Sequence, residues 1–235
     1  MKPFFFQLLA TAWLLVLPMT GLRAQLSVEV PYHEKAALDL DFTSPAWAGA
    51  GRIDGLHKMG SSLSVMGMVA NEEAKQASRI YLARDGEALY IGFEYLDGQA
   101  EEIAKTSKVD EAHWPKGEVA EIYLDGARAQ EGGYYHFAFN AAGSRAESVE
   151  RSMVPASGWE VVTRIDKDGW RAVARIPYAK LGMTADAPGL RGLFYRDYHS
   201  HAREEGKNER STWGGGALHS PDAFGELIFT GGKGS

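Results

Sequence analysis

Short runs of alternating apolar and polar residues, separated by turn residues, dominate the chain after residue 78. Because successive side chains of a strand point to opposite faces, each run predicts a β-strand with one apolar face. Asp85-Gly86 and the turn at 166–169 each stand between two such runs and predict hairpins. The predicted strands span residues 79–83, 88–96, 118–125, 133–141, 159–165, 170–176, 190–197 and 225–230.

Only two segments, 72–78 and 178–181, have a helical pattern, and both are short. Short strands with regularly spaced turns are typical of β-sandwiches. No linker-like stretch divides the middle of the chain, so we expect one all-β domain over residues 25–235. The predicted fold is a two-sheet antiparallel β-sandwich, jelly-roll or immunoglobulin-like, with few helical turns. Its predicted core includes apolar residues of three sheet segments: Ile91, Phe93, Ile122, Leu124, Phe137 and Phe139.

The first 24 residues have the pattern of a secretory signal peptide. Lys2 gives a charged start, residues 8–17 are almost entirely apolar, and Ala24 offers a small residue at the cleavage point. The apolar run is shorter than the ~20 residues that span a membrane. We therefore expect residues 1–24 to be removed and the mature protein to be soluble and exported, periplasmic or extracellular.

Composition excludes disulfide bonds and a cysteine-linked lipid anchor, and it disfavours nucleic-acid binding. The chain has no cysteine, which excludes a disulfide framework and a lipid anchor on a leader cysteine. Its net charge of -6 disfavours nucleic-acid binding, which depends on basic surfaces. Stability must therefore come from an apolar core.

Alternation also predicts a polar face on two neighbouring strands. It turns Glu121 outward from the strand at 118–125, and His136 and Asn140 outward from the strand at 133–141. If these strands share a sheet, the three side chains converge on one outer face, and we expect Glu121 to be presented to solvent. The opposite, apolar face carries six residues: Ala120, Ile122, Leu124, Tyr135, Phe137 and Phe139.

Six fragments of the chain resemble the carbohydrate-binding module family 9-like group, which has a β-sandwich fold. In order, they cover most of the predicted mature chain, whereas residues 25–70 match poorly. The fragments are ARDGEALYIGFEY (83–95), HWPKGEVAEIYLD (113–125), YYHFAFNAAG (134–143), DGWRAVARIPYAKLG (168–182), LRGLFYRD (190–197) and STWGGGALHSPDAFGELIF (211–229).

The resemblance implies a sugar-binding site. In that family two loop tryptophans sandwich a terminal sugar, which nominates Trp114 and Trp213, each followed by turn or glycine residues. The family's strand glutamate and asparagine correspond to Glu121 and Asn140, and Arg196 is a further polar candidate. Such residues suit sugars, because C–H faces pack on aromatic rings and hydroxyls bind charged or amide groups.

This sequence departs from the family pattern at two places. Trp114 stands seven residues before Glu121, one more than the family spacing, and Ala138 replaces a frequent arginine. Core packing is the alternative role for both candidate tryptophans, and it is the role we expect for Trp159 and Trp170.

Metal binding is a further alternative. His199 and His201, with Asp197 and Glu204, have the residue types of a metal site, although a solvated polar loop is the favoured interpretation. The resemblance also allows a structural calcium ion, for which the sequence assigns no ligands.

The leading hypothesis is an exported, non-catalytic carbohydrate-binding protein that supports polysaccharide breakdown, with glycoside hydrolases as partner enzymes. One rival is a haem-binding redox sandwich using Met66 or Met68. The other is a glycoside-active enzyme, which needs two carboxyl groups about 5–9.5 Å apart. Glu118 and Glu121 lie three residues apart on one strand and are predicted to point to opposite faces, which disfavours that reading.

Overall fold

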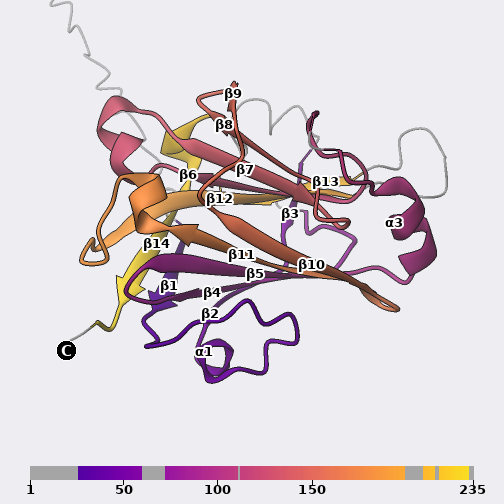
Figure 1. Ribbon diagram of the computed structural model, residues 1–235, viewed down its shortest axis with the longest axis horizontal. Helices are drawn as coiled ribbons and strands as arrows, with labels where there is room; N and C mark the ends of the chain where they lie inside the picture. The colour runs from indigo at the N-terminus through magenta and orange to yellow at the C-terminus, as the bar shows by residue number, and fades with distance from the viewer. Residues whose placement is uncertain (1–25, 60–71, 111, 199–208, 215–216, 233–235) are drawn as a thin grey trace, which may run out of the picture.

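The computed structural model describes residues 26–59, 72–110, 112–198, 209–214 and 217–232. Two β-sheets form stacked layers, with β6, β7 and β12 in one and β4, β5 and β11 in the other (Figure 1). This confirms the predicted two-sheet, all-β architecture. The predicted signal peptide lies outside the described residues.

The larger sheet has nine strands. Their order is β1-β14-β12-β6-β7-β8-β9, with β13 beside β12 and β3 beside β13. Its named pairs are antiparallel except β1 with β14, which run parallel. The bounds are β1 (Ser27–Pro31), β3 (His57–Met59), β6 (Val119–Leu124), β7 (Tyr135–Asn140), β8 (Arg145–Val149), β9 (Ser152–Val154), β12 (Gly189–Tyr198), β13 (Glu209–Trp213) and β14 (Gly225–Thr230).

The smaller sheet has five antiparallel strands in the order β10-β11-β5-β4-β2. Both predicted hairpins are present. At the first, a carboxylate oxygen of Asp85 accepts hydrogen bonds from the backbone N–H groups of Glu87 and Ala88 at 2.8 and 2.9 Å, which closes the turn. The bounds are β2 (Gly51–Asp54), β4 (Ser78–Arg84), β5 (Ala88–Leu96), β10 (Glu160–Asp166) and β11 (Gly169–Pro177).

Helical structure is confined to short turns in the described residues. The predicted turn at 178–181 is confirmed, but the helix predicted at 72–78 is wrong. There, Glu209 accepts the backbone N–H groups of Lys75 and Gln76, at 2.8 and 3.4 Å, and Glu73 forms an isolated bridge with His57. The bounds are α1 (Pro45–Ala48), α3 (Ala100–Thr106), η1 (Gly126–Glu131), η2 (Tyr178–Leu181) and η3 (Pro221–Ala223). None of these helices is long or apolar enough to cross a membrane.

The core lies between the two sheets. All six residues predicted for it have no exposed surface, and Trp159 and Trp170 are buried there too. Aromatic rings meet edge to face across the core, as Phe93 does with Phe139 at 5.4 Å between ring centroids. The alternation of apolar residues thus predicted which face of each strand turns inward.

Both sheets also carry apolar clusters on their outer faces. On the five-stranded sheet, the segment that contains α1 lies beneath β2 and β4 and packs Trp47 and Phe42 against Tyr81 (Figure 1). On the nine-stranded sheet, Tyr123 and Tyr195 belong to a cluster with Tyr134, Leu193 and Phe224. Positions that point away from the main core are therefore often buried, which matters for the candidate site.

Candidate functional site

The candidate site lies on the outer face of the nine-stranded sheet, around Glu121. Glu121 and Tyr123 alternate on β6, and His136 stands opposite Tyr123 on β7. Trp114 arrives from the loop that precedes β6. Strand register therefore fixes three of these side chains, and the loop adds the fourth.

The Glu121 carboxylate joins the other three side chains. Its Oε1 accepts a hydrogen bond from Nε1 of Trp114 at 3.2 Å. Its Oε2 accepts bonds from the Tyr123 hydroxyl at 2.5 Å and from Nε2 of His136 at 3.0 Å. Burial alone would raise the pKa of Glu121, but hydrogen bonds from His136, Tyr123 and Trp114 outweigh it and hold the pKa below its usual range. The carboxylate is therefore charged at neutral pH.

The aromatic rings stack in sequence across the sheet. His136 lies almost parallel to Tyr123, with centroids 3.9 Å apart and an angle of 15°. The Trp114 ring also contacts His136, with ring centroids 4.7 Å apart and an angle of 49° between the ring planes. Nε2 of His136 hydrogen-bonds the Glu121 carboxylate, and its Nδ1 lies 3.3 Å from the Ser148 hydroxyl, within hydrogen-bond distance. These contacts fix the orientation of the rings before any ligand arrives.

An open depression of about 290 Å³ adjoins this group. Its size is at the lower end of the range for small-molecule sites, about 300–1,000 Å³. Met153 leaves 59% of its surface exposed there, and Trp114 is half-buried. The lining residues are Trp114, His136, Ser148, Arg151, Met153 and His219.

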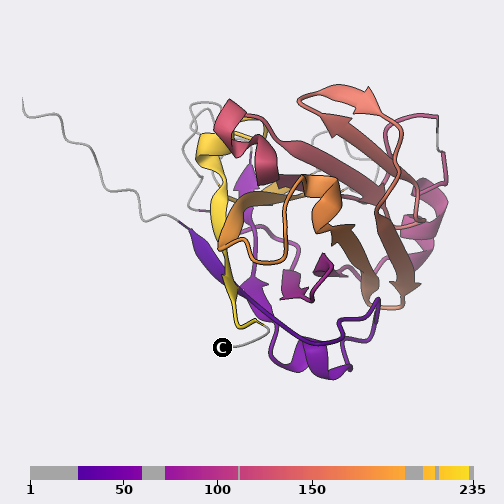
Figure 2. The same cartoon turned by 60° about the vertical axis from the view of Figure 1, so that its left-hand side comes forward.

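Two further segments contribute to the lining of the depression. The hairpin of β8 and β9, at the edge of the sheet in both views (Figure 1, Figure 2), carries Arg151 in its turn. His219 lies in the loop before η3, where its Nδ1 hydrogen-bonds the Tyr134 hydroxyl at 2.8 Å. Burial and the charge of Arg151 lower the pKa of His219, so its ring is neutral at pH 7.

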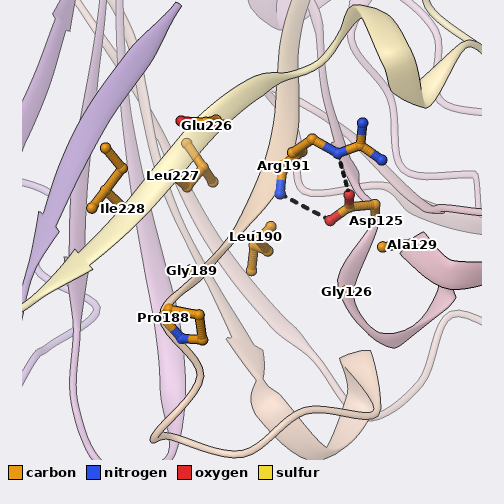
Figure 3. Close-up of a pocket in the computed structure, with 10 residues that line it drawn as sticks. All are labelled: Asp125, Gly126, Ala129, Pro188, Gly189, Leu190, Arg191, Glu226, Leu227 and Ile228. Carbon is orange, nitrogen blue, oxygen red and sulfur yellow. Dashed lines mark hydrogen bonds and ion pairs between the residues drawn. The ribbon is translucent and has the colours of Figure 1, made fainter.

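A second recess, of about 310 Å³, opens beside β12, β14 and η1 (Figure 3). Its main polar groups already bind each other, since the Asp125 carboxylate accepts the backbone N–H and Nε of Arg191 at 2.9 and 2.7 Å. Aliphatic residues such as Leu190 and Ile228 complete the lining, and it contains no aromatic ring. The depression beside Trp114 is therefore the better candidate for a sugar.

Searches against known proteins gave matches among solved structures. A family 9 carbohydrate-binding module from Caldicellulosiruptor kristjanssonii, in complex with cellotriose, matches with a TM-score of 0.59 and 16% identity over 88% of this chain and 94% of that one. A structure of a family 9 module from the same organism in complex with glucose also matches. Its TM-score is 0.59, and its identity is 15% over 89% of this chain and 98% of that one. The chain has the fold of a family 9 carbohydrate-binding module.

A candidate carbohydrate-binding protein from Bacteroides uniformis has the same fold, with a TM-score of 0.63 and 16% identity over 88% of this chain and all of that one. No family model matches the sequence, and neither does any curated protein. The similarity to family 9 modules is thus one of three-dimensional structure.

Of the residues predicted for a family 9 site, the structure brings together Trp114, Glu121 and His136. Glu121 is not presented to solvent as expected, because only 8% of it is exposed. The reason is that Trp114, Tyr123 and His136 all bind its carboxylate and pack around it.

Trp213 does not form the second wall that the family resemblance implied. It lies opposite Phe194 in the pairing of β13 with β12, and Phe194 points into the core. Its ring stacks on Phe194 with centroids 5.7 Å apart, and a Cβ added to Gly225 would lie 2.6 Å from the indole. Trp213 therefore belongs to the core, on the opposite side of the sheet from Trp114.

Asn140 is fully buried and does not reach the depression. Its Nδ2 donates to the carbonyls of Lys108 and Lys116 at 2.8 and 2.9 Å, and its Oδ1 accepts the backbone N–H groups of Ala142 and Ser144 at 3.1 and 3.0 Å. These four bonds use the capacity of the amide. Asn140 thus ties the loop that carries Trp114 to the turn after β7 and does not act as a ligand.

Arg196 is also fully buried and faces the core. Its Nη2 pairs with the Glu118 carboxylate at 3.2 Å, and its guanidinium lies 4.5 Å from the centroid of Tyr95. Because Glu118 points inward and Glu121 outward, the prediction that they occupy opposite faces is confirmed. Arg196 is a core residue, and the expectation of a sugar contact is corrected.

Six residues that line or support the depression were not among the predicted site residues. Alternation did place Tyr123 and Tyr134 on the outer face, but nothing marked them as part of a site. Ser148, Arg151 and Met153 come from β8 and β9, strands whose short, mixed pattern gave no prediction, and His219 comes from a loop.

The metal alternatives rest on residues that the structure leaves undescribed. His199, His201 and Glu204 lie outside the described residues, as do Met66 and Met68 of the haem alternative. Across the described ranges, no three His, Asp or Glu residues are grouped to hold a metal ion. Structural calcium stays an untested prediction.

Proposed function

We propose that this protein binds a saccharide, without cleaving it, in the depression beside Trp114. The main observation behind the proposal is the half-buried Trp114 ring. Its Nε1 donates a hydrogen bond to Glu121 at 3.2 Å, and the ring packs against His136. An aromatic ring fixed in advance can receive the C–H face of a pyranose without loss of side-chain freedom on binding. The two family 9 modules of the same fold, bound to cellotriose and to glucose, support this reading.

The carboxylates of the nine-stranded sheet favour binding over hydrolysis. A glycosidase needs an acid of raised pKa and a second carboxyl group aimed at the same bond. Glu121 has a lowered pKa, and Glu118 lies on the other face in a pair with Arg196. Neither residue matches the acid of that mechanism.

Calorimetry with glucose and cello-oligosaccharides, alongside a glycan array, tests the proposal. Trp114→Ala removes a wall of the depression and should weaken binding at least tenfold, since stacking contributes on the order of 1 kcal/mol beyond the buried area. Ile228→Ala, which trims an exposed apolar residue on β14, is the matched control and should leave affinity unchanged. Equal affinity of Trp114→Ala and wild type would refute the assigned site, and release of reducing ends by the pure protein would refute binding alone.

We further propose that the protein is exported, cleaved after Ala24, and supports polysaccharide breakdown beside glycoside hydrolases. The charged start and apolar run of residues 1–24 support export. N-terminal sequencing of exported protein should find Gln25 or a close neighbour first. An intact Met1 on exported material would contradict the cleavage.

A further inference from the structure

We propose that the depression selects acidic saccharides, whose carboxylate binds Arg151 and His219, over their neutral counterparts. The inference rests on the proposed function and names the ligand class of that same site. It concerns the part of the lining formed by the β8–β9 turn and the loop before η3.

The polar groups left for a ligand are mainly hydrogen-bond donors. The Glu121 carboxylate, which binds Trp114 and His136 of the lining, already receives three hydrogen bonds and is almost fully buried. The lining offers instead the guanidinium of Arg151 and the imidazole of His219. A wall rich in donors suits a ligand that brings acceptor oxygens, of which a carboxylate binds most strongly.

One ring nitrogen of His219 is already engaged by the protein. Its Nδ1 forms a hydrogen bond with the Tyr134 hydroxyl at 2.8 Å, and the charge of Arg151 acts on that hydroxyl. When the Tyr134 hydroxyl donates, the neutral imidazole carries its proton on Nε2 and can donate it to a ligand.

Arg151 keeps an uncompensated charge at the edge of the depression. Within the described part of the chain, no carboxylate forms an ion pair with it, whereas its neighbour Glu150 pairs with Arg128. The two members of the turn thus diverge, Glu150 toward η1 and Arg151 toward the depression.

The backbone of this turn is strained in a way that favours a role for the side chain. Val149 pairs with Ser152, so Glu150 and Arg151 form a two-residue turn, with φ values of 48° and 71°. Two-residue turns of this kind prefer Asn-Gly, because a left-handed backbone is costly for residues with a Cβ. Strained residues are concentrated at binding sites, where the side chain they present is needed.

The charges around His219 favour binding of a negatively charged group. The charged and titratable groups around His219 are Arg151, His136 and Glu121. Apart from burial, Arg151 and His136 lower the pKa of His219, and they outweigh the opposing effect of Glu121. A positive charge therefore dominates at His219, and a bound carboxylate would meet attraction there.

The test compares matched sugars that differ by one carboxylate. Glucuronic acid against glucose, and galacturonic acid against galactose, are titrated into the full protein by calorimetry at low and high salt. At low salt we expect the acid of at least one pair to bind about tenfold more tightly, the difference between charged and neutral hydrogen bonds. Salt should reduce that preference, because it screens exposed charges.

Three variants test whether Arg151 causes the preference. Arg151→Gln should bring the acidic and neutral sugars to equal affinity, and Arg52→Gln, on the exposed edge of the other sheet, should keep the wild-type preference. Arg151→Gly should behave like Arg151→Gln with a melting temperature no lower than wild type, since glycine suits the turn.

The outcomes separate this inference from the proposed function. Neutral sugars that bind as tightly as the acids, or a preference that survives in Arg151→Gln, would overturn the inference and leave saccharide binding standing. If no acidic or neutral sugar binds, the inference falls together with the proposed function.

Discussion

Replacing Glu121 by glutamine tests whether a charged carboxylate holds the candidate site together. Glu121 accepts three hydrogen bonds, from Trp114, Tyr123 and His136. A hydrogen bond to a charged group contributes about 1.5–3 kcal/mol and one between neutral groups about 0.5–1.5 kcal/mol. The amide also places its own NH₂ against one set of donors. We expect Glu121→Gln to lower the free energy of unfolding by about 2–4 kcal/mol.

The loss should depend on pH. The pKa of Glu121 in the folded protein lies below the ordinary value of about 4.3 that it has in the unfolded chain. Its contribution to stability is therefore fully present above the ordinary pKa and is lost as pH falls through the lowered one. The gap in stability between wild type and Glu121→Gln should narrow as pH falls from 6 toward 3.

Urea unfolding followed by circular dichroism at several pH values measures that gap. Glu29→Gln, at an exposed position of β1, is the matched control and should change stability little at any pH. A gap between wild type and Glu121→Gln that stays constant from pH 6 to pH 3 would refute the role assigned to the charge. A Glu121→Gln variant as stable as wild type at pH 7 would also refute that role.

Three further predictions concern residues whose roles the structure separates. Trp213→Ala should leave a core cavity and lower the free energy of unfolding, measured by urea titration, by about 3–5 kcal/mol. Trp114→Ala should instead mainly reduce saccharide affinity, measured by calorimetry. Asn140→Ala removes the side-chain partner of four buried or partly buried backbone groups, so it should cost about 2–4 kcal/mol and speed hydrogen exchange at the turn after β7; unchanged exchange would contradict this. Arg151→Gly should raise the free energy of unfolding by about 1 kcal/mol in calorimetric melting, because it relieves a left-handed residue, and a lower value would contradict the strain.

The long strands could be predicted because each has a clean alternation and a turn at its end. β5 matches the predicted residues 88–96, and β14 matches 225–230. The short strands β3, β8, β9 and β13 could not be predicted, because three to five residues of mixed polarity show no alternation of apolar and polar residues. Their pairing with longer neighbours makes them strands, and pairing is not a local property of sequence.

The errors at the site have the same origin. The glycines after Trp213 indicated a loop, yet the residue ends a strand whose register with β12 turns its ring inward. Arg196 was predicted as a polar sugar contact because of its charge, but it stands two residues after Phe194 and therefore shares the core face of β12. The signal that it belongs inside is Glu118, an acidic residue on the inward face of the neighbouring strand, which supplies the partner charge.

Glu118 and Glu121 show how one strand contributes to the core on one face and to the candidate site on the other. Glu118 and Arg196 form a fully buried pair, which the Trp170 indole completes with a hydrogen bond to Glu118 at 3.3 Å. Removing one member of such a pair would leave a buried charge, so the pair commits its strands to one register. On the opposite face, the separate pairing of β6 with β7 brings Glu121 near His136, and Trp114 binds the Glu121 carboxylate from the preceding loop. The inner pair and the outer group therefore both depend on β6 holding its place between β12 and β7.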